Sequence, residues 1–575
     1  MASYGILLLN RMIATRKDRI SMRRFDAKKC VLIVLIFLAG RCCLYADDQR
    51  PAHMMTVFNV KEYGATGTKT DNAGPAIQKA IDAASEAGGG VVYLPPGEFT
   101  SGTLRLRSHV NIYLESGATL FASEDPAAFD VQKAQSKDAL FFGEDIEDIS
   151  IGGRGTVDGQ AKYYWAPDTI ERSFLHKKLI VASGKSQMRS YPVGNGTRTV
   201  YPHLIWLGRC KNVSITGVSF VKSFSWTFAL FDCSRVVIDR VYLYSSLKEA
   251  VWADGIDIVD CKDVSISNST IITGDDCIVF VCGIPEWGPA SPCEHITVTN
   301  CRLSSASAAI KFSEGNSLVI RDILIDNCAI FDSNRGLTMQ IATGGDISNV
   351  VISNITMDLH RFDWFWAGDG NAFNFEIRRK SEWNDEPRKA DEPGPGSIHN
   401  VIVHDAIVHC QGESTIYGHP ESWLSGMTFE NIKFFISSNP DSPYDTARNA
   451  MSFRWIKDLK LRNIEVNWEK PAYERWESAL SLEDIDGLHV DGFSGIAAWP
   501  ERDFPAIALK NVQNAMLRDM DATQGNNVFV NVGGATSRDI HLLENNFHDA
   551  KVPYRMDSDV KPDAVTALDN FPAAK

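Results

Sequence analysis

The stretch VSITGVSF at residues 213–220 returns as VVIDRVYL at 236–243, VSISNSTI at 264–271 and ITVTNCRL at 296–303. Related octets begin at residues 323, 350, 401, 427, 459 and 488. Apolar and polar residues alternate within each octet, and a polar residue, often Asn, stands at its centre. This pattern is typical of two short strands that meet at a tight corner.

No helix of ten or more residues fits between consecutive octets. The spacing therefore excludes alternating strand and helix folds and leucine-rich horseshoes. The remaining solution winds each repeat once around a prism and stacks equivalent positions ~4.8 Å apart. The repeat predicts an all-β protein, a right-handed single-stranded parallel β-helix.

Two side-chain ladders are expected in this stack. Asn tolerates a left-handed corner, and its amide can bond the next Asn along the stack. Cysteines three residues before the first strand residue predict a second ladder of buried, reduced thiols. A disulfide is expected between Cys282 and Cys293, which bracket a Pro-rich loop. The Asn ladder comprises Asn268, Asn300, Asn327, Asn354, Asn431 and Asn463, and the thiol ladder Cys210, Cys233, Cys261 and Cys293.

The N-terminal end of an open stack needs a cover, because free strand edges pair with other chains. Residues 71–87 predict a capping helix, with Pro75 near its start and Ile77, Ile81 and Ala84 on one face. Gly88 to Gly90 end the helix ahead of the first long strand.

Residues 1–46 have the composition of a secretory signal peptide, with a basic flank, the apolar run VLIVLIFLAG at 31–40 and Ala46 before an acidic stretch. Met22 is a more ordinary start for such a signal. We expect the β-helix domain over residues 47–550 and a tail over 551–575. The sequence thus predicts a secreted or periplasmic protein without membrane insertion.

The net charge is −14, and removal of residues 1–46 would take away nine basic and two acidic residues, leaving −21. This balance excludes nucleic acid and anionic membranes as partners. It also means that an acidic polysaccharide would need a local basic pocket. We expect a monomer.

Three aspartates stand in the segment WADGIDIVDCKDVSISNSTIITGDDCIVF, residues 252–280. Asp254 and Asp275 are 21 residues apart, close to one coil, so they can lie on neighbouring rungs. Asp276 adds a third carboxylate if the backbone bends there, which Gly274 permits.

Carboxylates that share one place repel each other, which raises the pKa of at least one of them. One group can then donate a proton while another stays ionised, the division of labour that a glycosidase needs. An isolated Asp in such a protein more often decorates a turn, as expected for Asp239, Asp260 and Asp263. The pairing of DGID with GDDC at one-coil spacing favours a catalytic site over that interpretation.

The stretch FNVKEYGATGTKTDNAGPAIQKAIDAA, the stretch GGGVVYLPPGEFTSGTLRLRSHVNIYLESGATL, SFSW at 223–226, DGID and GDDC together resemble glycoside hydrolase family 28, the polygalacturonases of the pectin lyase-like superfamily. The resemblance covers roughly residues 57–360. It implies that Asp275 is the general acid and that Asp254 and Asp276 hold the attacking water of an inverting hydrolase. It implies no cofactor and no metal.

The chain departs from the family pattern at three places, and is to that extent a divergent member. Trp252 and Ala253 stand where the family has Asn-Thr, and SSASAAIKF at 304–312 stands where it has Gly-His-Gly. The family's Arg-Ile-Lys clamp on the uronate carboxylate is replaced by LTMQ, with Thr338 and Gln340 at the basic positions. A buried substrate carboxylate without a cation is strongly disfavoured, so a neutral or a sulfated sugar fits as well as galacturonate.

Further residues are candidates for substrate binding. Lys311 and Arg335 could replace the missing charge, although a solvated Lys and a corner Arg are equally reasonable interpretations. Sugar rings stack on aromatic faces, so tryptophans near the site could form platforms, although each is more often a core residue. The candidate substrate-binding residues are Lys311, Gln340, Arg335, Trp226, Trp287, Trp364 and Trp366.

Two other functions remain open. A polysaccharide lyase on the same fold would use the aspartates to hold Ca²⁺ and a basic residue to abstract a proton. A non-catalytic β-helix would bind glycans without releasing reducing ends. The conjunction of motifs favours the hydrolase.

Overall fold

A computed structural model of the chain describes residues 56–572 apart from 130–136, 162–169, 172–190, 193–201, 224, 248–249, 251, 285–286, 314–318, 363–367, 385, 439–446, 470–473 and 523–524. Residues 1–55 form a separate unit from Thr56–Lys575. The signal peptide expected at residues 1–46 lies outside the described residues.

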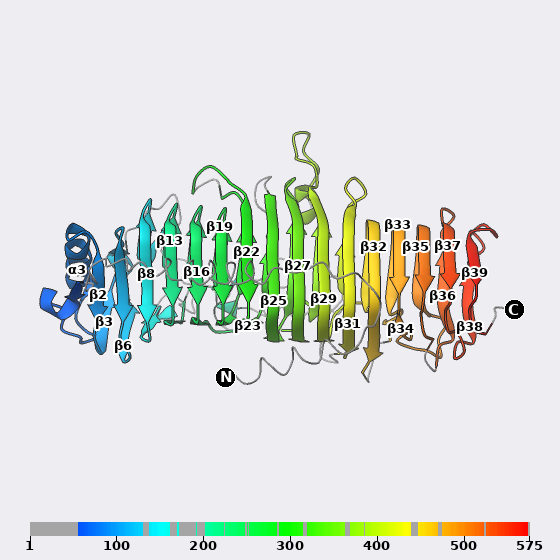
Figure 1. Cartoon of the computed structure of the whole chain (residues 1–575), viewed down its shortest axis with the longest axis horizontal. Coiled ribbons are helices and arrows are strands. Elements are labelled where there is room, and N and C mark those ends of the chain that lie inside the picture. Colours follow the sequence, from blue (N-terminus) through cyan, green and yellow to red (C-terminus); the bar gives the residue numbers. More distant parts are fainter. Residues whose placement is uncertain are drawn as a thin grey trace, which may run out of the picture. The chain divides into compact units, whose positions relative to one another are not determined.

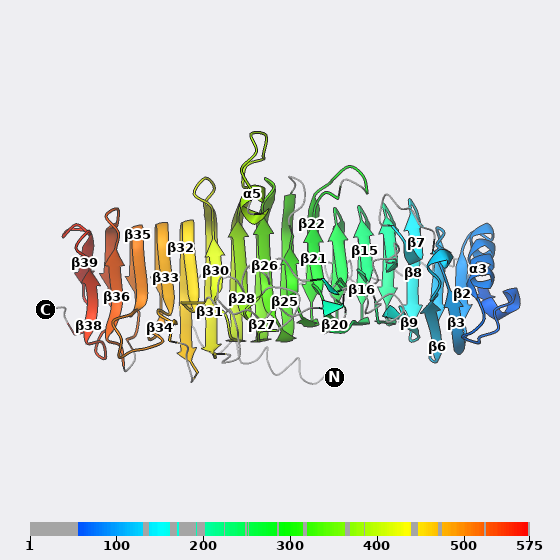
Figure 2. The same ribbon diagram turned by 180° about the vertical axis from the view of Figure 1, so that it is seen from behind.

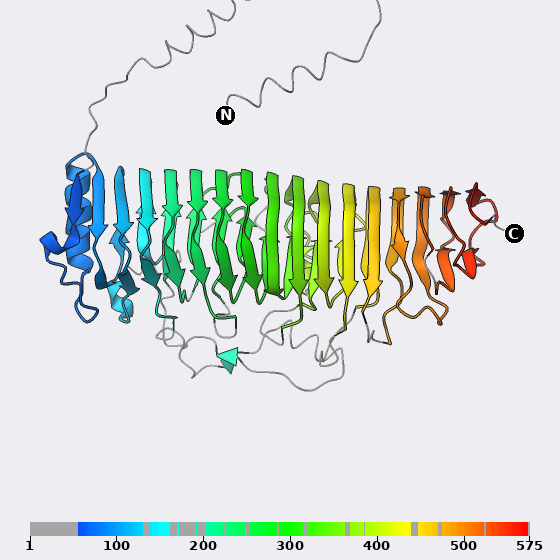
Figure 3. The same ribbon diagram turned by 60° about the horizontal axis from the view of Figure 1, so that its bottom comes forward.

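Residues 56–572 form a right-handed parallel β-helix, as the repeat predicts (Figure 1). Thirty-seven strands are joined in ladders, and each strand pairs in parallel with its counterpart one coil away. The coils follow one another in sequence order, so neighbours in space are neighbours in the repeat (Figure 3). Three sheets run along the stack, and here they are called the first, second and third sheets.

The first sheet consists, in stacking order, of β4 (Leu104–Arg105), β7 (Ala139–Glu144), β12 (His203–Gly208), β15 (Phe228–Phe231), β18 (Ile256–Val259), β21 (Ile278–Val281), β24 (Ala308–Phe312), β26 (Arg335–Ile341), β28 (Asn371–Ile377), β30 (Ser414–Tyr417), the first parts of β32 (Met451–Trp468), β33 (Leu480–Asp491) and β35 (Pro505–Arg518), β36 (Val528–Gly533) and β38 (Val552–Met556). Several of its strands are labelled in Figure 2.

The second sheet consists of β1 (Val57–Asn59), β2 (Gly90–Leu94), β5 (Val110–Leu114), β8 (Glu147–Gly153), β13 (Lys211–Thr216), β16 (Ser234–Asp239), β19 (Lys262–Ser267), β22 (Cys293–Thr299), β25 (Val319–Ser333), β27 (Asp346–Leu359), β29 (Ser397–Cys410), β31 (Leu424–Ile436), the later parts of β32, β33 and β35, β37 (Arg538–Leu543) and β39 (Val565–Leu568). The third sheet consists of β3 (Gly97–Ser101), β6 (Ala118–Ala122), β9 (Thr156–Asp158), β14 (Ser219–Val221), β17 (Tyr242–Tyr244), β20 (Thr270–Thr273), β23 (Arg302–Ser305), the ends of β25, β27, β29, β31 and β32, and β34 (Ser494–Gly495).

A few elements lie outside these sheets. They are η2 (Val60–Tyr63), α3 (Gly74–Glu86), η3 (Pro126–Ala128), α5 (Lys380–Asn384) and an antiparallel pair of β10 (Ile170–Glu171) with β11 (Tyr191–Pro192). Helix α5 lies in an insertion between β28 and β29 (Figure 2), and it overlaps the start of residues 381–397, a run whose sequence lacks the repeat. The other run without the repeat, 161–202, falls largely outside the described residues.

The interior of the β-helix is a continuous apolar stack. In the first sheet, Ile256, Ile278, Ile310, Leu337 and Phe373 occupy equivalent positions on successive rungs, and each is at most 1% exposed. Successive residues of a strand point to opposite sides, so the residue after each of these points outward. The outward positions are therefore the ones that can carry chemistry.

Helix α3 covers the N-terminal end of the stack, as predicted. It begins at Gly74 with Pro75 in its first turn, and Ile77, Ala80, Ile81 and Ala84 are fully buried against the first coils.

The Asn ladder forms as expected. All six predicted asparagines have φ between 48° and 56°, the left-handed conformation that Asn tolerates. The amide of Asn327 donates to Asn300 (2.7 Å), and Asn300 donates to Asn268 (3.2 Å). Asn354 instead donates to Asp326 on the preceding coil (2.7 Å), so the stack of corner amides contains acidic members that the sequence pattern did not mark.

The thiol ladder forms as well, and Cys210, Cys233, Cys261 and Cys293 are buried and reduced. The expected disulfide between Cys282 and Cys293 is wrong, because both residues carry free thiols. Each thiol is oriented toward a different backbone carbonyl, Cys282 toward Val319 (3.3 Å) and Cys293 toward Ile258 (3.7 Å).

At the C-terminal end, β38 and β39 pair in parallel with β36 and β37. The coils thus continue through Leu568, beyond the boundary expected at residue 550. Among the described residues, no helix has the length and apolar character needed to cross a membrane.

Candidate active site

The three aspartates lie at the start of adjacent strands of the first sheet. Asp254 precedes β18, and Asp275 and Asp276 precede β21, which is the next rung. A spacing of one coil therefore places Asp254 beside Asp275 and Asp276.

The bend before β21 depends on Gly274. A Cβ atom at this position would lie 2.2 Å from the carbonyl oxygen of Ala250 and 2.5 Å from that of Ser246. Only glycine allows this close approach of two backbone segments. The backbone N–H of Asp276 then donates to the carboxylates of Asp254 (3.2 Å) and Asp275 (3.0 Å).

The three carboxylates converge. One oxygen from each of Asp254, Asp275 and Asp276 lies within 4.8 Å of the other two. The side chains are 5%, 6% and 1% exposed, so the cluster is almost withdrawn from bulk water. In such surroundings, neighbouring charges act strongly on one another.

Asp276 is the member that is held as a carboxylate. Its Oδ2 accepts a hydrogen bond from the ammonium of Lys311 (2.9 Å) and its Oδ1 accepts one from the backbone N–H of Ala308 (2.8 Å). Burial alone would raise the pKa of Asp276, but the charges of Lys311 and Arg335 outweigh it and keep this pKa below its ordinary value. Asp276 is therefore ionised over a wide pH range.

Asp275 and Asp254 have the opposite tendency. Burial raises the pKa of Asp275 well above its ordinary value, and the charges of Asp254 and Asp276 add to the effect. Burial likewise raises the pKa of Asp254, with contributions from Asp257 and Asp276. The cluster thus places one carboxyl group with a lowered pKa beside two with raised pKa values, an arrangement that favours the separation of acid from base within one site.

A fourth carboxylate, Asp257, belongs to the same cluster and was not singled out by the sequence. It points outward from β18, is 1% exposed, and its Oδ2 has no hydrogen-bond partner among the described residues. Burial raises its pKa, and the charges of Asp276 and Asp275 raise it further. DGID itself contains this residue, but strand alternation alone does not predict that two residues three positions apart share a face, so the sequence pattern did not mark Asp257 as part of the cluster.

The candidate binding residues Lys311 and Arg335 both lie beside the aspartates. The guanidinium of Arg335 donates to Ser307 Oγ (2.9 Å), in the segment that replaces the family's Gly-His-Gly. Gln340 lies two residues beyond Thr338 on β26 and donates to Asn374 Oδ1 (3.0 Å). Its side chain therefore lies on the outward face, two residues further along the strand than Thr338, which pairs with Lys311 on the preceding rung.

Trp226 and Trp287 lie in an apolar cluster on the outward face of the first sheet, on the N-terminal side of the aspartates. Trp287 is 5% exposed and packs edge-on against Trp206 (5.8 Å), Trp226 (5.7 Å) and Phe231 (5.9 Å). Trp226 is half-buried at the margin of this cluster. Of the two, Trp226 is the more exposed. Trp364 and Trp366 fall outside the described residues.

The geometry of Asp254, Asp275 and Asp276 could also hold a metal ion, since three carboxylate oxygens are within reach of one point. Lys311 already supplies a positive charge to this cluster, at 2.9 Å from Asp276. The cluster's negative charge is therefore partly compensated by the protein itself.

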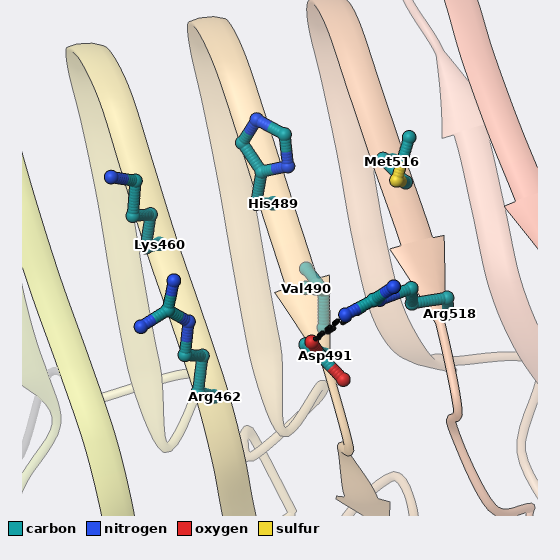
Figure 4. A pocket seen from close by; sticks show the side chains of 7 residues that line it. All are labelled: Lys460, Arg462, His489, Val490, Asp491, Met516 and Arg518. Carbon is teal, nitrogen blue, oxygen red and sulfur yellow. Dashed lines mark hydrogen bonds and ion pairs between the residues drawn. The ribbon is translucent and has the colours of Figure 1, made fainter. Parts of the chain in front are cut away.

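A surface pocket of about 300 Å³ lies elsewhere, on the outward face of the second sheet (Figure 4). It is lined by Lys460, Arg462, His489, Val490, Asp491, Met516 and Arg518. Arg518 is paired with Asp491 (2.6 Å) and Arg462 with Glu430 (3.3 Å), and both arginines are about half exposed. These contacts are those of a solvated ion-pair ladder, and the pocket is not part of the aspartate cluster.

Comparison with known proteins places these motifs in a family. Residues 90–360 match the glycosyl hydrolases family 28. A probable polygalacturonase of Vitis vinifera is 24% identical over 54% of this chain and 62% of its own length. An exo-poly-α-D-galacturonosidase of Dickeya chrysanthemi is 26% identical over 52% of this chain and 55% of its own. The chain thus spans less than two thirds of either relative.

Solved structures give the same fold. An exopolygalacturonase of Thermotoga maritima aligns with a TM-score of 0.55 at 18% identity, over 72% of this chain and 92% of its own. The family 28 exopolygalacturonase of Yersinia enterocolitica aligns with a TM-score of 0.51 at 19% identity, over 77% of this chain and 79% of its own. Over residues 90–360 the chain is therefore similar to the glycosyl hydrolases of family 28, and its curated relatives there are polygalacturonase-like enzymes.

Proposed function

We propose that this protein is a secreted, monomeric enzyme that hydrolyses glycosidic bonds of a plant or algal cell-wall polysaccharide with inversion at the anomeric carbon. The observation that carries the proposal is the convergence of Asp254, Asp275 and Asp276 within 4.8 Å, with Lys311 bonded to Asp276. The names of the relatives point to pectic polymers, and the fold is one that presents such a cluster at the start of neighbouring strands.

In this mechanism Asp275 donates its proton to the leaving oxygen, because burial raises the pKa of this carboxyl group well above its ordinary value and so favours its protonated form. Asp276, kept ionised by Lys311, accepts the proton of the attacking water. Asp254 holds the same water by a second hydrogen bond. The proton lost by Asp275 and the proton gained by Asp276 balance the reaction and leave both products neutral at the cleaved bond.

Inversion is proposed on the family resemblance. The acid and the base of an inverting glycosidase are typically ~6.5–9.5 Å apart, whereas a retaining pair is ~5–5.5 Å apart. The nearest oxygens of this cluster approach within 4.8 Å. The anomeric configuration of the first product is therefore the measurement on which this part of the proposal stands or falls.

The proposed substrate contacts follow from the same geometry. Lys311 and Arg335 form the positive margin of the site, Gln340 offers an amide to sugar hydroxyls, and Trp226 offers a ring face. Trp287 contributes by packing against Trp226, while the place of Trp364 and Trp366 rests on the sequence alone.

The test is to incubate the full chain with pectic, hemicellulosic and algal polysaccharides and to record reducing ends and the anomer of the first product. We expect one substrate class to be cleaved with inversion. Asp275→Asn should lower the rate at least ~10³-fold while the thermal melt is retained. A retained anomer, or unchanged turnover in Asp275→Asn, contradicts the mechanism.

The matched control is Asp263→Asn, because Asp263 lies at an exposed corner with φ of 56°, a conformation that Asn also adopts. Its turnover should equal that of the unmodified protein.

Two further measurements identify the alternative functions. An unsaturated product that absorbs in the ultraviolet, together with loss of activity in chelator, indicates a lyase. Binding without release of reducing ends indicates a glycan-binding protein.

A further inference from the structure

A row of neutral polar side chains runs along the outward face of the first sheet on the C-terminal side of the aspartates. Starting from Lys311, the equivalent position on each successive rung is Thr338, Asn374, Thr415, Ser452 and Ser481. We call these five residues the polar row. Their inward neighbours are core residues such as Leu337, Phe373 and Ile416, so strand alternation directs the row outward.

The row has hydrogen-bonding capacity of the kind that sugar hydroxyls need. Hydroxyl and amide groups both donate and accept, as sugar hydroxyls do. The Asn374 amide donates to Thr415 Oγ1 (2.8 Å) and accepts from Gln340 (3.0 Å), which fixes its orientation. The hydroxyl of Thr338 is fully buried on this face and has no hydrogen-bond partner among the described residues. A buried hydroxyl without a partner is costly unless a ligand satisfies it.

The charges beside the row do not favour an anionic sugar. Arg378 is paired with Glu376 (2.5 Å), and Glu483 pairs with both Arg454 (3.3 Å) and Lys510 (2.8 Å). Glu413 accepts hydrogen bonds from the hydroxyl of Ser452 and from the backbone N–H of Arg448 (2.8 Å), which are neutral donors. A substrate carboxylate beside Asn374, Thr415 or Ser452 would meet Glu413 and Glu376, and Arg378, Arg454 and Lys510 are already paired with acidic side chains.

The opposite direction along the same face is covered. Before Lys311, the equivalent positions on the rungs are Phe142, Trp206, Ala229, Asp257 and Val279, and Trp287 packs over this stretch. The loop that carries Trp287 is held by Gly283 N–H on Asp260 (2.8 Å) and by Ser291 on Asp232 (3.0 Å). Among the described residues, these equivalent positions therefore offer hydrogen-bonding side chains mainly toward the C-terminal coils, with Asp257 as the exception on the N-terminal side.

We propose that the polar row forms the saccharide subsites of this protein and that these subsites take uncharged sugar residues. The inference rests on the proposed function, since it supposes that a polysaccharide reaches the aspartates. It departs from what the relatives' names suggest, because galacturonate would be disfavoured on the C-terminal side of the cleavage point.

The test compares two probes that differ only in charge: an α-1,4-linked oligogalacturonide and the same oligomer with its carboxyl groups reduced to neutral galactose. Binding is measured by calorimetry on the Asp275→Asn variant of the full chain, so that turnover is not needed. We expect the reduced oligomer to bind at least ~10-fold more tightly than the acid form, about 1.4 kcal/mol. Equal affinity, a preference for the acid form or binding of neither probe overturns the inference.

Charge insertion provides a second, independent readout. Thr415→Lys adds a cation to the row and should raise affinity for the acid oligomer about tenfold. Ser481→Lys serves in its place if Thr415→Lys fails to fold. The matched control is Thr428→Lys, because Thr428 points outward from the second sheet beside Lys460. If Thr428→Lys raises affinity as much as Thr415→Lys, the row is not the binding surface.

The two proposals fail in different ways. A protein that binds the reduced oligomer but cleaves none of the polysaccharides contradicts the hydrolase and leaves the subsites supported. A protein that cleaves with inversion but prefers the acid oligomer contradicts the subsites and leaves the hydrolase supported.

Discussion

The outward face of the first sheet has two parts that differ sharply although the same backbone ladder builds both. From β7 to β21 the face is apolar and covered by Trp287, and Asp257 is a buried carboxyl group within it. From β24 onward it is polar, beginning with Lys311 and continuing through the polar row. The interior stack does not change at this boundary.

The comparison shows that side chains pointing inward stabilise the fold, whereas side chains pointing outward are available for binding and catalysis. Inward residues such as Ile278 and Ile310 are apolar on both sides of the boundary, because burial there stabilises every coil. Outward residues are not needed for the stack, so they can be apolar beneath a loop in one part and polar in the next. The aspartates lie where the two parts meet.

The largest expected effect is a loss of stability when the packing of Trp287 over the apolar part of the face is removed. Trp287→Ala removes a nearly buried ring from the cluster with Trp206 and Phe231 and should lower stability by ~3–5 kcal/mol. Thermal unfolding followed by circular dichroism measures the loss. Trp252→Ala is the control, because its side chain is 39% exposed and its removal should change stability by about 0.5 kcal/mol or less. Equal losses of stability in the two variants would show that the packing of Trp287 on the first sheet does not stabilise the protein.

A second, smaller effect is expected at Asp257. Its pKa is raised in the folded protein, so ionisation of the unfolded chain above pH ~4 favours unfolding. Asp257→Asn removes this penalty. Its stabilisation should be absent near pH 3 and grow by up to ~1.4 kcal/mol per pH unit until the folded pKa is reached.

Melting temperatures of Asp257→Asn at pH 3.5 and pH 6.5 measure this slope. Asp559→Asn, at an exposed position near the C-terminus, should give the same difference from the unmodified protein at both pH values. A stabilisation by Asp257→Asn that is independent of pH would show that the pKa of Asp257 is the same in the folded and the unfolded protein.

The smallest expected effect concerns the first residue of the polar part. Lys311→Met removes the ammonium that lowers the pKa of Asp276, so this pKa should rise. Because the proposed base must be ionised, the acidic limb of the pH–rate profile should move to higher pH by about one unit, with ~10-fold lower activity on that limb. Lys510→Met is the control, since Lys510 is an exposed partner of Glu483 on the same sheet. An unshifted acidic limb would remove Lys311 from the mechanism.

Local sequence was enough for the β-helix, the capping helix and the ladder of corner asparagines. Each depends on residues close in the chain: alternation at Val264–Ile271, an apolar helix face at Ile77 and Ile81, and Asn at a left-handed corner. The one-coil spacing of Asp254 and Asp275 follows from the same repeat, so their proximity could also be predicted.

Tertiary structure decided how these groups behave. The opposite pKa directions of Asp275 and Asp276 depend on burial and on Lys311, which belongs to the next coil. The free thiols of Cys282 and Cys293 depend on which carbonyl each side chain faces, and the cover over the apolar part depends on a loop that folds back with Trp287. Repeat patterns record only the periodicity of the backbone, whereas burial, charge pairing and loop packing arise between segments that no local pattern relates.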